Sequence, residues 1–385
     1  MNRLIATLVL LAVALLQAAA AHAEPIAPKN DNELVETLPA VSGNRAEERR
    51  LRRELTAQPR NSAVASAIAR HYLDQAREQG DPRFAGQALA ALQAWPEPAS
   101  APQEVLLMQA TVQQYLHEFD PAARKLELLL KREPRDAQAW LTLATVRRVQ
   151  GHYAESDAAC AALGRLGAAL YAGACQAEND GLRGNFDGAR ATLKTLIATP
   201  RLAPETRSWL LTTLAELEAR GGQASDAEAA YRTALDAEPD SYTAMSYADF
   251  LIGLGRDADA LTQLKGQRRT DAVLLRLAIA GTRAKSPEGV RDAREMRERI
   301  ALANLRPDAK VFHAREQAMF ALWVDQQPQR ALALARVNVQ QQREPLDLLV
   351  LAQAARASGQ AAALRDAERA LKELGLRDQR IAALL

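Results

Sequence analysis

The sequence predicts an all-α protein, built as a right-handed solenoid of antiparallel helix pairs. Glycines recur at a nearly constant interval, and small or apolar residues stand at fixed distances on either side of each one. No segment alternates apolar and polar residues for long enough to indicate a strand. A period near 34 residues is typical of stacked helical repeats, in which each pair buries its apolar face against its neighbours.

Composition excludes several classes of protein. The 385 residues carry 49 Lys and Arg against 47 Asp and Glu, a formal net charge of +2, so bulk positive charge cannot recruit nucleic acid. The hydrophobic fraction of 48% is too high for a disordered chain, and the charged fraction of 25% argues against many membrane spans. Two cysteines exclude a disulfide scaffold and any multi-cysteine metal framework.

Residues 1–23 have the pattern of a secretory signal peptide. Arg3 precedes an apolar stretch from Leu4 to Leu16, and small residues follow before a cut after Ala23. The alternative is an uncleaved membrane anchor, although the stretch is shorter than the ~20 residues that span a bilayer. We expect an exported, periplasmic protein with no transmembrane segment in its mature chain. Residues 24–45 contain three prolines and no sustained periodicity, which predicts a flexible leader.

The repeat is clearest around four glycines separated by 33, 38 and 33 residues, namely Gly151, Gly184, Gly222 and Gly255. An alanine stands seven residues before each of them, and Ser or Ala stands five residues after. Glycine can adopt a positive φ and end the first helix, while small residues let two antiparallel helices approach to about 8–10 Å. Two less regular units precede these, with Gly80 and His117 at the turn position.

Beyond residue 270 the repeat weakens, but helical periodicity continues. The expected pairs are 272–284 with 287–305, 313–325 with 328–341, and 345–358 with 361–374. Counted from Asn61, this gives roughly nine pairs at a period near 34 residues. The expected organisation is a solenoid over 46–270, followed by divergent helical repeats or a cap over 271–385. Because such an array is held by nearest-neighbour contacts, we expect no contacts that tie its ends together.

These units resemble the tetratricopeptide repeat, a 34-residue helix–turn–helix motif. Residues 137–170 match it with Trp140, Leu143, Gly151 and Tyr153, and residues 208–241 match it with Leu214, Ala215, Gly222, Ala227, Tyr231, Ala234 and Pro239. Ser156 and Gln176 depart from the motif, so the intervening units are divergent. The resemblance covers residues 61–270. It implies a superhelix whose concave surface holds an extended peptide or a partner helix.

A candidate partner groove follows from the repeat frame. Positions thirteen, ten, six and three residues before each glycine form one stripe of the first helix, and the opposite stripe is more apolar and is expected to be packed. The exposed stripe carries three aromatic residues beside three carboxylates, Tyr171, Trp209 and Tyr242 with Glu178, Glu216 and Asp249. Such a groove suits a protein or peptide segment with basic and apolar residues. The alternative is that the aromatics pack against neighbouring helices and the carboxylates are merely solvated.

Two cysteines could meet in this architecture. Cys160 falls on the second helix of one unit and Cys175 on the first helix of the next, and these helices pack together. Export to an oxidising compartment would permit a disulfide, which could add about 3 kcal/mol to the free energy of unfolding. The alternative is a pair of buried free thiols acting as small apolar residues.

No enzymatic motif is found. Phosphate-loop, dinucleotide-binding, nucleophile-elbow and zinc-helix patterns are all missing from the sequence. The four histidines after residue 23 are far apart in the chain, so we expect no metal site, cofactor or catalysis. The predicted function is therefore a non-catalytic, exported scaffold for protein–protein interaction that does not bind nucleic acid. The alternative is an accessory subunit of a cell-envelope machine, for polysaccharide export, outer-membrane assembly or cytochrome maturation.

Overall fold

The structure is a computed structural model that describes residue 30, residues 45–305 and residues 313–385. The predicted signal peptide and almost all of the predicted leader lie outside the described residues. Asn44–Leu385 form one compact unit. Its described residues are helical or irregular and contain no strand, as the sequence predicts. Among them, no helix combines the length and apolar character needed to cross a bilayer.

The six helices whose bounds were predicted, all beyond residue 270, begin and end within a few residues of those positions. The helices of the described residues are α2 (Arg45–Ala57), α3 (Ser62–Gln79), α4 (Pro82–Ala91), the 3₁₀ turn η1 (Pro98–Ser100), α5 (Gln103–Tyr115), α6 (Phe119–Arg132), α7 (Ala137–Val149), α8 (Tyr153–Arg165), α9 (Ala169–Leu182), α10 (Phe186–Ile197), α11 (Pro204–Arg220), α12 (Ala224–Ala237), α13 (Ser241–Gly253), α14 (Asp257–Gln263), α15 (Asp271–Arg283), α16 (Pro287–Ala303), α18 (Ala314–Trp323), α19 (Pro328–Asn338), α20 (Pro345–Ala357), α21 (Ala361–Leu374) and α22 (Gln379–Ala382). The three pairs predicted beyond residue 270 are all present.

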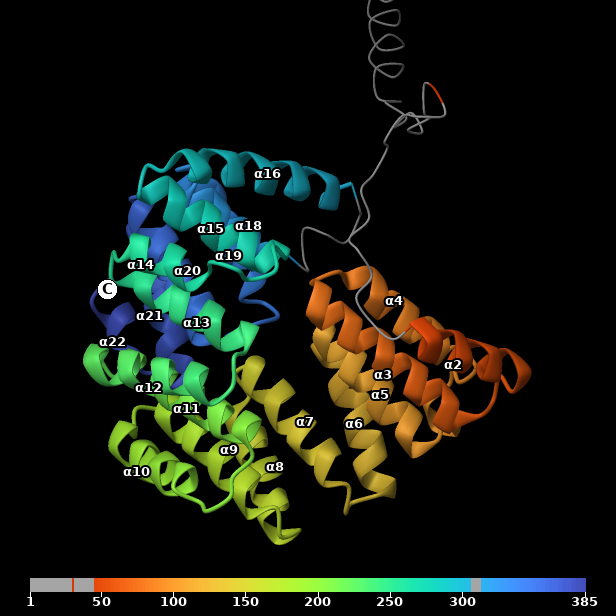
Figure 1. Cartoon of the computed structure of the whole chain (residues 1–385). Helices are drawn as coiled ribbons and strands as arrows, with labels where there is room; N and C mark the ends of the chain where they lie inside the picture. The colour runs from red at the N-terminus through yellow and green to blue at the C-terminus, as the bar shows by residue number, and fades with distance from the viewer. Residues whose placement is uncertain (1–29, 31–44, 306–312) are drawn as a thin grey trace, which may run out of the picture. The chain divides into compact units, whose positions relative to one another are not determined.

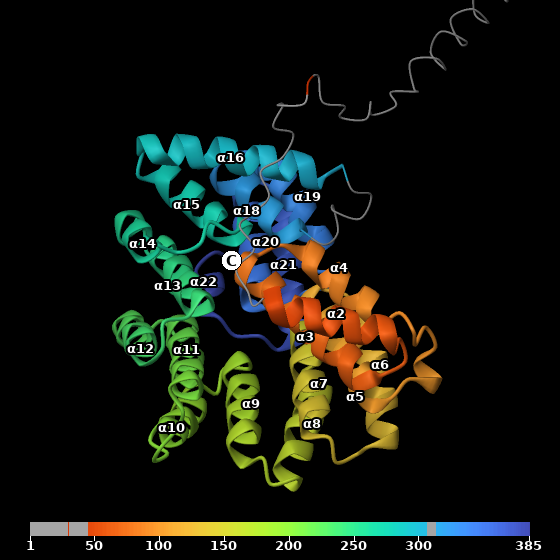
Figure 2. The ribbon, with the colours of Figure 1, turned by 45° about the vertical axis from the view of Figure 1, so that its right-hand side comes forward.

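The helices stack as antiparallel pairs, from α3 and α4 to α20 and α21 (Figure 1). The first helix of each pair contacts the first helices of the pairs before and after it, so these helices form a continuous layer. The second helices make their main contacts with the first helices that flank them. Figure 2 shows α9, α11 and α13 following one another in this layer. The predicted all-α solenoid of helix pairs is confirmed.

Local chemistry explains where the helices start and turn. Asp136 and Asp240 cap α7 and α13 by accepting hydrogen bonds from main-chain N–H groups three residues later, at 2.9 and 2.8 Å. The turn glycines at positions 151, 184, 222 and 255 have φ between 76° and 96°, which only glycine adopts without strain. His117 occupies the same turn position with φ 61°, so the weak unit keeps the turn geometry of the others.

The packed stripe lies where the repeat frame predicts it. Its residues are buried on the first helices, namely Leu143, Ala144, Leu211, Leu214, Ala215, Tyr247 and Ala248. Trp140, in the same stripe, packs beside the two cysteines and donates its indole N–H to the carbonyl of Pro134 at 2.9 Å. The opposite stripe of the first helices is therefore left to face away from this core.

One expectation about long-range contacts is wrong. The loop between α19 and α20 and the end of α21 contact the turn of the α7–α8 pair, and the segment after α21 contacts the turns of the α9–α10 and α11–α12 pairs. The main-chain N–H of Arg343 donates to the carbonyl of Val149, and that of Arg377 donates to the carbonyl of Leu182, both at 2.8 Å. Both views place α22 next to the α11–α12 pair (Figures 1 and 2). Distant pairs thus touch, because the curvature of the stack brings them together.

Candidate partner-binding surface

The three predicted aromatic residues are exposed on consecutive first helices. Tyr171 on α9, Trp209 on α11 and Tyr242 on α13 expose 42%, 36% and 60% of their surface. The rings of Tyr171 and Trp209 are neighbours, with centroids 6.0 Å apart and planes inclined at 30°. These residues are not absorbed into the packing between helices. With the three carboxylates they form a surface that we call the aromatic strip.

Two of the three strip carboxylates are neutralised by arginines of neighbouring first helices. Glu178 accepts from the guanidinium of Arg148 on α7, with a nitrogen–oxygen distance of 2.9 Å. Asp249 accepts from Arg276 on α15 at 2.6 Å. These carboxylates are therefore neither free nor merely solvated, and the strip carries less negative charge than its sequence indicates.

Glu216 differs from them because its partners are hydroxyl groups. Its Oε1 accepts hydrogen bonds from the hydroxyl of Tyr242 at 2.9 Å and from that of Ser246 at 2.8 Å. Burial raises the pKa of Glu216, and the nearby charge of Arg220 opposes that rise. The negative charge of Glu216, followed by burial, raises the pKa of Tyr242 well above its ordinary range. Glu216 is thus the centre of a polar cluster within the strip.

The repeat frame explains why Glu216 has no equivalent of Arg148. Arg148 stands three residues before its turn glycine and reaches the carboxylate of the next first helix. The residue at the same place on α9 is Gly181, against which the side chain of Leu217 packs. No cation can therefore reach Glu216 from that position. Arg148, Arg276 and Ser246 were not predicted as strip residues, although the arginine three places before Gly151 was a usable signal.

Arg220 is a further residue that the sequence did not single out. It lies one helical turn after Glu216 on α11, and only 5% of its surface is exposed. Its Nε and Nη2 atoms are buried and have no hydrogen-bond partner among the residues that the structure describes. The hydroxyl of Tyr153 is also buried, without a hydrogen-bond partner in the described part of the chain, and the charge of Arg220 acts on it. Burial raises the pKa of Tyr153 to about 12.

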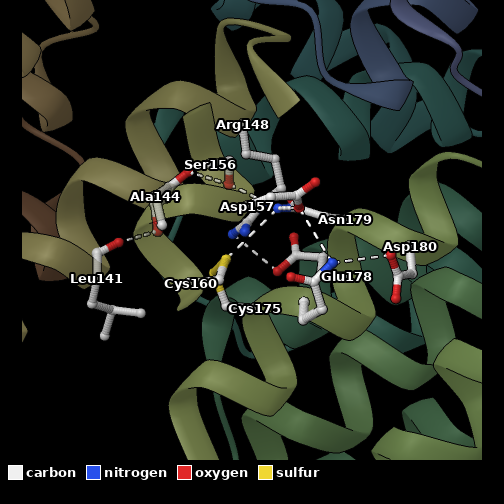
Figure 3. Close-up of a disulfide and its surroundings, with 12 residues drawn as sticks. Leu141, Ala144, Arg148, Ser156, Asp157, Cys160, Cys175, Glu178, Asn179 and Asp180 are labelled. Atoms are coloured by element: carbon white, nitrogen blue, oxygen red, sulfur yellow. Dashed lines mark hydrogen bonds and ion pairs between the residues drawn. A yellow bond between two sulfur atoms is a disulfide. The ribbon is translucent and has the colours of Figure 1, made fainter. Parts of the chain in front are cut away.

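Cys160 and Cys175 form a disulfide in the structure, with Cα atoms 5.7 Å apart (Figure 3). The bond joins α8 to α9, and Cys175 stands one helical turn before Glu178 on α9. Asn179 lies beside it and donates to the hydroxyl of Ser156 at 2.9 Å and to the Sγ of Cys160 at 3.7 Å. The hydroxyl of Ser156 in turn donates to the carbonyl of Ala144 at 2.9 Å. This network fixes α9, which carries Tyr171 and Glu178, to the preceding pair.

No group of three or more metal-ligating side chains is found among the described residues. A cleft of about 420 Å³ lies between α12, α13 and α14, and it is lined by Arg232, Tyr247 and Arg256, among others. The hydroxyl of Tyr247 there is engaged by Glu228 and Arg232, at 3.0 and 3.3 Å. None of the aromatic-strip residues lines this cleft.

No family model matches the chain. No curated protein is similar to it in sequence. Among solved structures, a tetratricopeptide repeat protein from Parabacteroides merdae is 18% identical, with a TM-score of 0.46 over 57% of this chain and 83% of that one. A thermophilic tetratricopeptide protein from Thermus thermophilus is 20% identical, with a TM-score of 0.40 over 50% of this chain and 99% of that one.

A third similar structure is the human IFIT1 dimer with m7Gppp-AAAA. It is 14% identical, with a TM-score of 0.45 over 88% of this chain and 77% of that one. Two of these three similar structures are described as tetratricopeptide repeat proteins. The architecture itself is established by the helix pairs described above.

Proposed function

We propose that this protein is a non-catalytic, exported scaffold that binds a protein partner through the aromatic strip. The observation that carries the proposal is the exposure of Tyr171, Trp209 and Tyr242 on three consecutive first helices. Large aromatic side chains are costly to leave in water, and at interfaces they act as rigid anchors. Their alignment along the stack suits an extended segment or a helix that lies across several repeats.

The charges of the strip define the partner's chemistry. Arg148 and Arg276 already neutralise Glu178 and Asp249, whereas Glu216 has hydroxyl partners in place of an arginine. We expect the partner to place an apolar side chain against Tyr171 and Trp209 and a basic side chain near Glu216. An incoming cation would lower the pKa of Glu216 and restore the charge that burial disfavours.

The proposal also includes the location of the protein, which is exported, and its alternative role as a subunit of an envelope machine. The pattern of residues 1–23 supports export. The mass of the mature protein tests it, since cleavage after Ala23 leaves Glu24 as the first residue. Co-purification from the native envelope would then separate a soluble scaffold from an accessory subunit, because a subunit brings membrane proteins in fixed stoichiometry.

The strip is tested by substituting Trp209→Ala and Glu216→Lys together and measuring capture of native partners. We expect capture to be lost. The first substitution removes the aromatic anchor, and the second replaces a carboxylate with a positive charge that repels a basic partner. The matched control is Leu302→Ala with Glu298→Lys on α16, where both side chains are exposed away from the strip. Loss of capture in the control, or full capture by the strip variant, would contradict the proposal.

A further inference from the structure

Arg220, the last residue of α11, carries one guanidinium edge that no group in the described part of the chain uses. Only 5% of Arg220 is exposed. Its Nε and Nη2 atoms lie on the same edge of the guanidinium, and both are buried without a hydrogen-bond partner among the described residues. Burying a charged group is costly unless its polar atoms are satisfied, so this edge favours an acceptor.

The same edge holds a carboxylate at two other places in this chain. Arg190 donates from Nε and Nη2 to the two carboxylate oxygens of Glu218, at 2.6 and 2.7 Å. Arg315 does the same to Asp347, at 2.5 and 2.9 Å. Both carboxylates are buried, and parallel N–H···O bonds of this kind are among the strongest polar contacts in proteins. The geometry that Arg220 offers is therefore one that suits a carboxylate.

Tyr153, the first residue of α8, supplies a second donor near Arg220. Only 5% of Tyr153 is exposed, and its hydroxyl is also buried without a partner among the described residues. Of the charges that act on this hydroxyl, Arg220 is the strongest, followed by Arg148 and then by Glu344. A hydroxyl and a guanidinium can both donate to one acceptor. The two side chains together thus favour a single acceptor that carries negative charge.

The carboxylate of Glu216 is the group of this chain best placed to compete with an outside anion. It stands one helical turn before Arg220 on α11, and the charge of Arg220 acts on it. Its Oε1 accepts instead from the hydroxyls of Tyr242 and Ser246. Burial raises the pKa of Glu216, which reduces the negative charge that would oppose an incoming anion.

The repeat frame shows that packing does not require a cation at position 220. Val149 and Leu182 also lie two residues before their turn glycines, and both are buried apolar residues. An apolar side chain would fill this position without the free-energy cost of burying a charge. Helix packing alone therefore does not account for Arg220.

We propose that Arg220 and Tyr153 form a buried site that binds the carboxylate group of a small organic anion. The guanidinium edge donates two parallel hydrogen bonds to the two oxygens of the anion, and the hydroxyl of Tyr153 donates a third. Because only 5% of each side chain is exposed, a folded partner does not reach this edge, and the ligand is small. Neither residue belongs to the aromatic strip, so the site is independent of the proposed function.

Thermal unfolding of the full-length, oxidised protein tests the site with acetate as the probe. Sodium acetate replaces sodium chloride up to about 100 mM at constant ionic strength, so that screening does not change. A ligand that binds only the folded state raises the midpoint of unfolding until its site is filled. We expect a rise of about 2 °C or more that saturates as the acetate concentration increases.

Two variants assign the effect to the site. Arg220→Met removes the guanidinium edge and should abolish the acetate effect, whereas Tyr153→Phe removes one hydroxyl and should reduce it. The matched controls are Arg232→Met, in the cleft beside α12, and Tyr72→Phe. The hydroxyl of Tyr72 already donates to Glu48 at 3.1 Å. Both controls should keep the full acetate effect.

A second measurement is independent of stability. Saturation transfer from the protein to the methyl protons of acetate should be present in the natural protein and lost in Arg220→Met. If that variant does not fold, Tyr153→Phe should still weaken the transfer. Transfer that is equal in the natural protein and in Tyr153→Phe would contradict the role of the hydroxyl.

Phosphate is the comparison that decides the class of ligand. It stabilises proteins in general by exclusion from their surface, so its effect should be the same in the natural protein and in Arg220→Met. An acetate effect that persists in Arg220→Met, or that is missing from the natural protein, would overturn the site and leave water as its occupant. A phosphate effect that depends on Arg220, with no acetate effect, would overturn the carboxylate as ligand. These outcomes leave the aromatic strip untouched, because capture of a partner is measured separately.

Discussion

The main-chain N–H of Arg377 donates a hydrogen bond of 2.8 Å to the carbonyl of Leu182, although the two residues belong to different halves of the chain. Leu182 is the last residue of α9, so its carbonyl has no partner within the helix. The same relation joins Arg343 to Val149 at the end of α7. The C-terminal part of the chain thus satisfies these helix-end carbonyls. It also couples repeats that a simple nearest-neighbour array would leave independent.

The crossing of α15 and α16 is predicted to tolerate no side chain at its closest point. A Cβ on Gly289 would lie 2.2 Å from the carbonyl carbon of Gly281, and both atoms belong to regions fixed by helix packing. Gly289→Ala should therefore lower the free energy of unfolding by several kcal/mol, about 2–4. Urea unfolding followed by circular dichroism measures the change.

The control for this prediction is Gly86→Ala in the middle of α4. A Cβ there would meet no atom of the described residues within 4 Å. Alanine should then raise the free energy of unfolding by about 0.5–1 kcal/mol, because it reduces the entropy of the unfolded chain. Equal effects at positions 86 and 289 would show that the close approach of α15 and α16 is wrong.

The disulfide between Cys160 and Cys175 is predicted to persist in the mature protein. The chain has two cysteines, and both are placed in this bond. Labelling of the denatured protein with a thiol reagent, without reductant, should therefore find no reactive thiol, whereas two reactive thiols would refute the bond. Replacing both cysteines by alanine should lower the free energy of unfolding by about 3 kcal/mol, since the bond closes a loop with a sequence separation of 15.

His117 is predicted to make the protein sensitive to mild acid. Burial lowers the pKa of His117 below its ordinary value of 6.5, and the charges near it are Glu316, Arg315, Glu344 and His313. The folded state therefore favours the neutral ring, while the unfolded chain binds a proton near pH 6.5. Stability is intact above that pH and declines as the pH falls from 6.5 toward the lowered pKa.

The variant His117→Asn tests this sensitivity. Asparagine tolerates the positive φ of 61° at this turn but carries no titratable group. Between pH 7.5 and pH 5.5, the variant should lose less of its free energy of unfolding than the natural protein does. An identical loss in both proteins would assign the acid sensitivity to other groups.

Glu216 is predicted to have the opposite effect on the pH dependence of stability, because its contribution is largest in acid. Because burial raises the pKa of Glu216 above its ordinary value of 4.5, the folded state favours the protonated carboxyl. Its contribution to stability is complete below pH 4.5 and is lost as the pH rises through the raised pKa. Glu216→Gln keeps the acceptor for Tyr242 and Ser246, so it should be more stable than the natural protein at pH 7 and equally stable at pH 4. A variant less stable at pH 7 would contradict this.

The helix pairs and the two stripes could be predicted because they depend on local spacing. The turn glycines, the buried residues of the packed stripe and the exposure of Trp209 all follow from one repeat frame. The arginine partners of Glu178 and Asp249 could not be predicted in the same way, because they come from neighbouring helices. Which side chains of neighbouring first helices face each other depends on how far each helix pair is rotated relative to the next.

The contacts between the turn glycines and the C-terminal part of the chain could not be predicted, for a related reason. The contact between Gly184 and Arg377 depends on the curvature accumulated over many pairs, and no short-range pattern encodes that sum. The sequence does contain one hint, since Arg220 is polar where the equivalent residues, Val149 and Leu182, are apolar. Gln379 lies against the turn two residues beyond Arg220.

Site-specific photocrosslinking in living cells tests the central claim most directly. A photoreactive amino acid is placed in turn at positions 171, 209 and 242, and at position 302 on α16 as an exposed control. The account predicts that one and the same protein is crosslinked from all three strip positions, that it is missing at position 302, and that Glu216→Lys abolishes it. Crosslinks that are no stronger at the strip than at position 302 would contradict the claim.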